Sequence, residues 1–119
     1  MRSRLWAAGA AAVAAALLAA PAFARPATIP YQVDVTITNS SCTLDHLSVS
    51  KHNKLILFHV ISNGTFSHQF HIWGVSSGII KAGQEGRFEV NFHRSGKYGY
   101  SCYNSHALLA KGTFTIRKT

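Results

Sequence analysis

Carboxylates are the scarcest charged group in this 119-residue sequence, which has four Asp and Glu against twelve Lys and Arg. The four acidic residues are scattered along the chain, so the sequence indicates no catalytic carboxylate dyad. The basic residues are also dispersed and form no run or arm, and we therefore expect no nucleic-acid binding. Repeats and low-complexity segments are absent after the first 24 residues.

The N-terminal segment has the pattern of a secretory signal peptide. Arg2 and Arg4 precede an Ala- and Leu-rich stretch over residues 5–20, and Ala22-Phe23-Ala24 matches a cleavage site. We predict that residues 1–24 are removed and that the mature chain is periplasmic or secreted, with no stable membrane insertion. Ten basic and four acidic residues give this mature chain of 95 residues a net charge of +6.

The mature chain alternates like a β protein and has no apolar stripe at helical spacing. Residues 25–30 contain two prolines and are predicted to form an extended lead-in to one domain over residues 31–119. The predicted strands cover residues 31–38, 47–50, 55–62, 66–73, 86–93, 98–102 and 111–117. The strand over 55–62 is a near-continuous run of apolar, β-branched and aromatic residues, which predicts burial on both faces. The pattern is typical of a Greek-key β-sandwich or barrel.

Cysteine is rare, with only Cys42 and Cys102. Two cysteines in an exported chain predict one disulfide between them. That prediction competes with a second use of Cys102, because a strand ends at this residue and His106 follows on the next predicted loop. A thiolate and an imidazole on one loop suit copper or zinc.

A third metal ligand is available on the strand over 66–73. By alternation His68 shares the inward face with Phe70 and Ile72, whereas His71 points outward. His68 alone would be interpreted as a hydrogen-bonded core histidine. Together with Cys102 and His106 it becomes a candidate ligand.

These residues and their surroundings resemble the cupredoxins, the family of small blue-copper sandwiches. The resemblance rests on Asn63-Gly64, the string His68-Gln-Phe-His-Ile72, the tyrosines before Cys102, and Lys111-Gly-Thr-Phe-Thr-Ile116. It implies a copper ion held by His68, Cys102 and His106. It also implies an electron carrier or copper carrier that works with a redox or metal-transfer protein partner. We expect a monomer and no enzyme, because copper enzymes of this fold need further domains or a second copper site.

The sequence departs from the cupredoxin pattern in two places. The family usually has an axial Met where this chain has Ala110, and its only methionine is Met1. The resemblance then leaves the backbone oxygen of Ser67, a water or nothing as the fourth contact. The second departure is Cys42, which is similar in position to a cysteine in the cupredoxin-like domain of periplasmic iron-uptake proteins of the EfeO type.

Three hypotheses remain open at this point. The first is a cupredoxin with copper on His68, Cys102 and His106. The second is a copper or iron chaperone, or an uptake accessory domain, that uses Cys42, Cys102 and a nearby histidine such as His71. The third is a metal-free structural or partner-binding sandwich with a Cys42–Cys102 disulfide.

Overall fold

The computed structural model describes residues 28–119, which form nine strands. The predicted signal peptide and residues 25–27 of the predicted lead-in lie outside the described residues, and residues 28–30 have no regular structure. Within the described part of the chain, no helix is long and apolar enough to cross a membrane.

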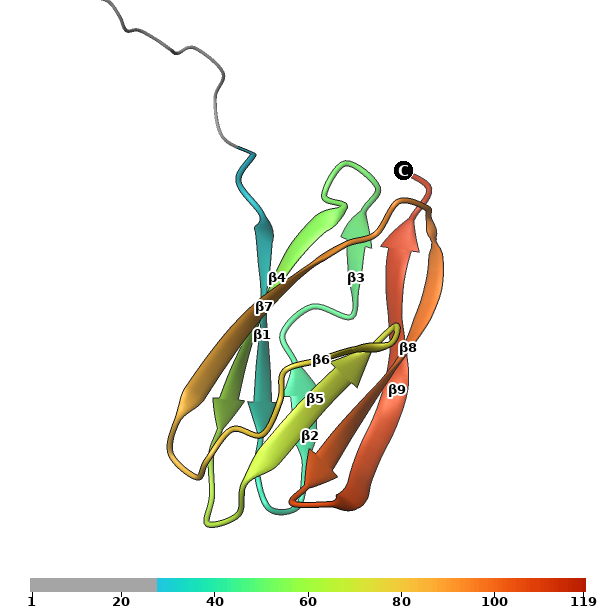
Figure 1. Ribbon diagram of the computed structural model, residues 1–119. Coiled ribbons are helices and arrows are strands. Elements are labelled where there is room, and N and C mark those ends of the chain that lie inside the picture. The colour runs from blue at the N-terminus through green and yellow to red at the C-terminus, as the bar shows by residue number, and fades with distance from the viewer. Residues whose placement is uncertain (1–27) are drawn as a thin grey trace, which may run out of the picture.

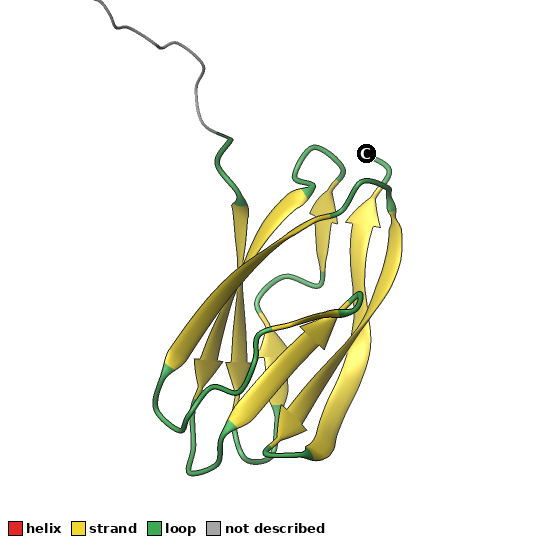
Figure 2. Cartoon of the chain, in the orientation of Figure 1, coloured by secondary structure: helices red, strands yellow, loops and turns green. Residues whose placement is uncertain are grey.

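The strands form two sheets that face one another (Figure 1). The four-stranded sheet has the order β2 (Cys42–Leu44), β1 (Tyr31–Ile37), β4 (Leu55–Ser62) and β7 (Glu85–Asn91). The five-stranded sheet has the order β3 (Ser48–Ser50), β9 (Ala107–Arg117), β8 (Gly96–Asn104), β5 (His68–Ile72) and β6 (Val75–Ser76). All of the regular structure in residues 28–119 is β (Figure 2), so the predicted all-β sandwich is confirmed.

Phe58 of β4 lies at the centre of the core between the sheets. Its ring centroid is 5.3 Å from that of Phe70 and 5.6 Å from that of Phe114, both in the opposite sheet. Phe88 and Phe92 complete the cluster from the β7 side. Such tilted and edge-on pairs stabilise a core beyond the apolar area that they bury.

The prediction that β4 is buried on both faces is wrong. Ile56, Phe58, Val60 and Ser62 are buried, but the residues between them are only partly buried. The reason is that β4 is central within its sheet, while no described element covers the outer face of that sheet. The outer apolar residues of β4 are shielded only by neighbouring side chains.

The connection after Cys102 also differs from the prediction. We expected a loop from residue 103 to 110, but β8 continues to Asn104 and β9 begins at Ala107. Only Ser105 and His106 form the turn, and Ser105 has a φ of 50°. The register shifts between Cys102 and Tyr103, so a bulge in β9 takes up one residue. A tight hairpin therefore replaces the loop that was expected to hold a metal.

Candidate functional site

Cys42 and Cys102 form a disulfide that joins the two sheets, with their Cα atoms 6.4 Å apart. The disulfide is one of the two uses of Cys102 that the sequence left open, and it is the one present in the structure. Cys102 is fully buried and Cys42 is half-buried. In this oxidised state neither sulfur is a thiolate, and a thiolate is the form of cysteine that binds a metal.

His68 is fully buried on the inner face of the five-stranded sheet, as the alternation predicted. The hydroxyl of Ser62 lies 2.8 Å from its Nδ1 and also donates to the carbonyl oxygen of Phe66 at 3.4 Å. Either atom can be the donor in the contact between Ser62 and Nδ1, and Nε2 carries the lone pair when Nδ1–H donates to the hydroxyl. This Nε2 atom is buried and has no hydrogen-bond partner among residues 28–119.

His68 and Cys102 are neighbours on the inner face of the five-stranded sheet. They lie on the adjacent antiparallel strands β5 and β8, where Cys102 pairs with Phe70 and His68 pairs with Asn104. Both side chains are buried between the sheets, and the two residues are diagonal neighbours in the register. Diagonal positions of this kind are about 7 Å apart, within reach of long or aromatic side chains. The ring of His68 and the sulfur of Cys102 therefore belong to the same part of the core.

His106 is placed differently. It is exposed and lines an open pocket of about 280 Å³ with Gln69, His71, Tyr103 and Ser105. Gln69 and His71 lie on the face of β5 opposite to His68, which confirms the outward orientation predicted for His71. The tight β8–β9 hairpin explains why His106 is separated from His68, because the hairpin places His106 on the outer side of the sheet.

The predicted ligand set of His68, Cys102 and His106 is therefore divided between the two faces of the five-stranded sheet. No group of three or more His, Cys, Asp or Glu side chains in the described range is arranged to hold a metal ion. The backbone oxygen of Ser67, considered as an axial contact, accepts a hydrogen bond from the Ser105 amide at 2.7 Å. Of the candidate residues, Cys42 and Cys102 are joined by the disulfide, and His68 is the diagonal neighbour of Cys102 in the strand register.

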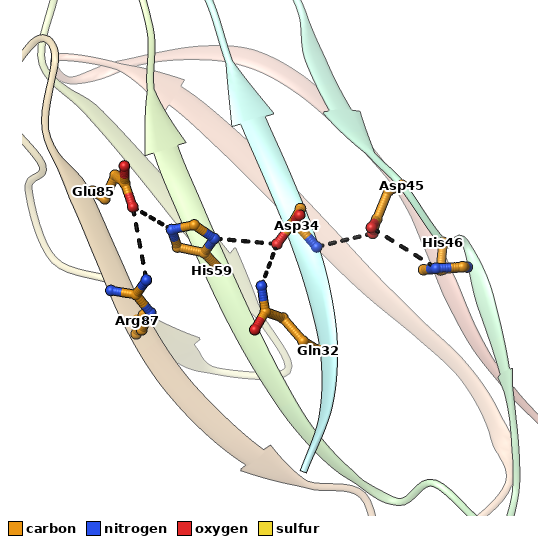
Figure 3. A network of polar contacts seen from close by, with 7 residues as sticks. All are labelled: Gln32, Asp34, Asp45, His46, His59, Glu85 and Arg87. Atoms are coloured by element: carbon orange, nitrogen blue, oxygen red, sulfur yellow. Dashed lines mark hydrogen bonds and ion pairs between the residues drawn. The ribbon is translucent and has the colours of Figure 1, made fainter.

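A second polar cluster, which sequence reasoning missed, lies on the outer face of the four-stranded sheet (Figure 3). His59 of β4 is held between Asp34 of β1, 3.1 Å from its Nδ1, and Glu85 of β7, 2.5 Å from its Nε2. A hydrogen bond from Gln32, and the hydrogen bond and charge of His59, lower the pKa of the Asp34 carboxyl below its ordinary value of 3.8. The sequence gives no signal for this cluster, because it depends on the parallel pairing of β1 with β4.

The comparisons with known proteins bear on the fold. No protein-family model matches the chain, and no curated protein is similar to it in sequence. The crystal structure of a multicopper oxidase superimposes with a TM-score of 0.51 at 17% sequence identity, over 73% of this chain. The superposition spans 44% of that longer chain, so the comparison supports a conclusion about the fold alone. With its two sheets, nine strands and this neighbour, the chain has a cupredoxin-like fold.

Proposed function

We propose that this protein is an exported copper carrier whose Cys42–Cys102 disulfide is the oxidised form of a copper(I) site. In the reduced form the ligands are the two thiolates and the Nε2 atom of His68. The observation that carries the proposal is the buried Nε2 atom of His68, which has no hydrogen-bond partner among the described residues and belongs to the diagonal neighbour of Cys102 in the strand register. A buried polar atom of this kind requires an explanation, and a metal ligand is one.

The chemistry of these donors suits copper(I). Thiolate is a soft ligand and imidazole is an intermediate one, and such a set selects copper(I) over hard cations. In the proposed site Ser62, whose hydroxyl lies 2.8 Å from Nδ1 of His68, accepts the Nδ1–H, in the way that outer hydrogen bonds hold metal-binding histidines. Ile37, which pairs with Cys42 on one side and Ser62 on the other, adds an apolar wall that limits the access of water.

The disulfide form is converted to the dithiol form by thiol–disulfide exchange, in which electrons and protons balance. A partner protein with a dithiol transfers two electrons and two protons to the disulfide and becomes a disulfide itself. The two thiols of this chain lose two protons when copper(I) binds. The partner that reduces the disulfide and the partner that delivers or takes up the metal are the proteins we expect this chain to meet.

A carrier is favoured over an electron-transfer protein because the geometry separates His106 from Cys102. A blue-copper centre needs a thiolate and two imidazoles in one plane. Among the described residues, His68 is the histidine that neighbours Cys102 in the strand register. Export agrees with the predicted signal peptide and with the presence of a disulfide, which persists in oxidising compartments. We propose no catalytic role for this single domain.

The test is anaerobic titration of the reduced mature chain with copper(I), in competition with a coloured copper(I) chelator. We expect one tightly bound ion per chain. Cys102→Ser should abolish this binding, and His68→Gln should weaken it at least about tenfold. His93→Gln is the matched control, because His93 is exposed and follows β7 at the opposite end of the sandwich. Circular dichroism of each variant separates loss of binding from loss of the fold.

The same disulfide favours a second candidate, a metal-free sandwich in which it only fastens the two sheets. A reduced chain that keeps its fold and leaves all copper(I) on the chelator would overturn the carrier proposal in favour of this structural role. Binding that is unchanged in His68→Gln would also contradict the proposed ligand set.

A further inference from the structure

The pocket beside the β8–β9 hairpin contains ligand-type side chains that the proposed copper(I) site does not use. Two imidazoles, a phenol, an amide and a hydroxyl line it, from His71, His106, Tyr103, Gln69 and Ser105. They come from two adjacent strands and one turn. Both histidines are accessible from solvent, since His71 is partly exposed and His106 is exposed.

His71 is held in place on the sheet. Its Nε2 lies 3.0 Å from Oε1 of Gln69, and the hydroxyl of Ser76 approaches the same nitrogen at 3.5 Å. The ring packs against Tyr103 with a centroid distance of 4.9 Å. An amide oxygen that accepts from Nε2–H leaves Nδ1 as the atom with the lone pair. A histidine oriented by a hydrogen bond at its other nitrogen is the usual arrangement of a metal ligand.

The surroundings of the pocket restrict the metal that could bind. All four acidic residues of the sequence lie in or directly after strands of the four-stranded sheet, and the five-stranded sheet has none. Calcium and magnesium ions bind through several oxygen ligands, mostly carboxylates. Imidazole nitrogen instead suits copper(II), which also leads the affinity order of divalent ions at such donors.

We infer that the pocket is a second metal site, which binds copper(II) through His71 and His106, with Tyr103 beside the ion. The site uses no cysteine and lies on the face of the sheet opposite to His68 and Cys102. It therefore works in the disulfide-bonded form and does not rest on the proposed copper(I) site. A chain with both sites could take up either oxidation state of copper according to the state of its disulfide.

The test uses the oxidised mature chain, in which both cysteines are in the disulfide, and titrates it with copper(II) against glycine as a competing ligand. Binding is followed by calorimetry and by electron paramagnetic resonance. We expect one ion per chain with coupling to two imidazole nitrogens. His71→Gln and His106→Gln should each lower the affinity by about 10–100-fold. His52→Gln is the control, because His52 is exposed and lies in the turn after β3.

Two results would overturn the inference. One is a double His71→Gln/His106→Gln variant that binds copper(II) as tightly as the unaltered chain. The other is a resonance spectrum that shows fewer than two imidazole nitrogens. Both variants change exposed or half-exposed side chains, so they are expected to fold, and thermal unfolding of each variant checks this. Because the cysteines are in the disulfide during this titration, a negative result for copper(II) leaves the copper(I) proposal standing. A negative result in the copper(I) titration of the reduced chain likewise leaves the copper(II) site standing.

Discussion

Two histidines of this molecule, His59 and His68, are both enclosed by neighbouring residues, but the hydrogen-bond partners of their ring nitrogens differ. His59, on the outer face of the four-stranded sheet, has a carboxylate at each nitrogen. His68, between the sheets, has a hydroxyl at one nitrogen and no partner at the other among residues 28–119. A fully satisfied histidine stabilises a sheet, whereas a buried and incompletely satisfied one indicates a site that is completed by something else.

The largest expected effect comes from removing the disulfide beside His68. The double variant Cys42→Ala/Cys102→Ala should lose roughly 2–4 kcal/mol of unfolding free energy, because the unfolded chain regains the entropy of a closed loop. Urea unfolding measures this loss. The His59 cluster should be unaffected, so the NMR signals of its ring should not move. A double variant as stable as the parent would show that the disulfide contributes nothing to the fold.

Changing the hydroxyl beside His68 should have the next largest effect. Ser62→Ala removes the partner of a buried ring nitrogen and should cost about 1–3 kcal/mol of unfolding free energy. The same variant should lower copper(I) affinity in the reduced form by about 10–100-fold, because it releases the orientation of the ring. A loss of stability with unchanged copper(I) affinity would assign Ser62 a purely structural role.

The His59 cluster predicts a smaller, pH-dependent effect. The pKa of Asp34 is lower in the folded chain than its ordinary value of 3.8. Since 3.8 is also the value for the unfolded chain, the stability that this carboxylate contributes is present above about pH 4 and is lost as the pH falls through the lower, folded pKa. Asp34→Asn should flatten the dependence of unfolding free energy on pH below about pH 4. Parallel curves for the variant and the parent would contradict this account.

The smallest effect is expected at the edge of the same cluster. Arg87 approaches Glu85 at 3.8 Å, and both side chains are more than half exposed. Arg87→Gln should therefore change the unfolding free energy by less than about 0.5 kcal/mol, since exposed ion pairs contribute little. A loss above about 1 kcal/mol would mean that Arg87 supports the His59 cluster more directly than the exposed geometry suggests.

The parts of this structure that depend on local alternation could be predicted from the sequence. The inward orientation of His68 and Phe70 and the outward orientation of His71 follow from strand periodicity. Two cysteines in a chain with a predicted signal peptide made the disulfide one candidate, but the sequence did not decide between it and a metal thiolate at Cys102.

The remainder depends on signals that the sequence does not carry. Ser105 and His106 form a two-residue hairpin turn, but they lack the Asn-Gly or Asp-Gly pattern by which such turns are recognised. The hairpin was therefore missed, and His106 was expected next to Cys102. The contact of Asp34 with His59 arises from parallel strand pairing, which no short stretch of sequence determines.

The measurement that tests the central proposal most directly is X-ray absorption at the copper edge of the reduced, copper(I)-loaded mature chain. Ligation by Cys42, Cys102 and His68 predicts two sulfur neighbours and one imidazole nitrogen around the ion. One sulfur with two imidazole nitrogens would contradict this account and restore the set of His68, Cys102 and His106.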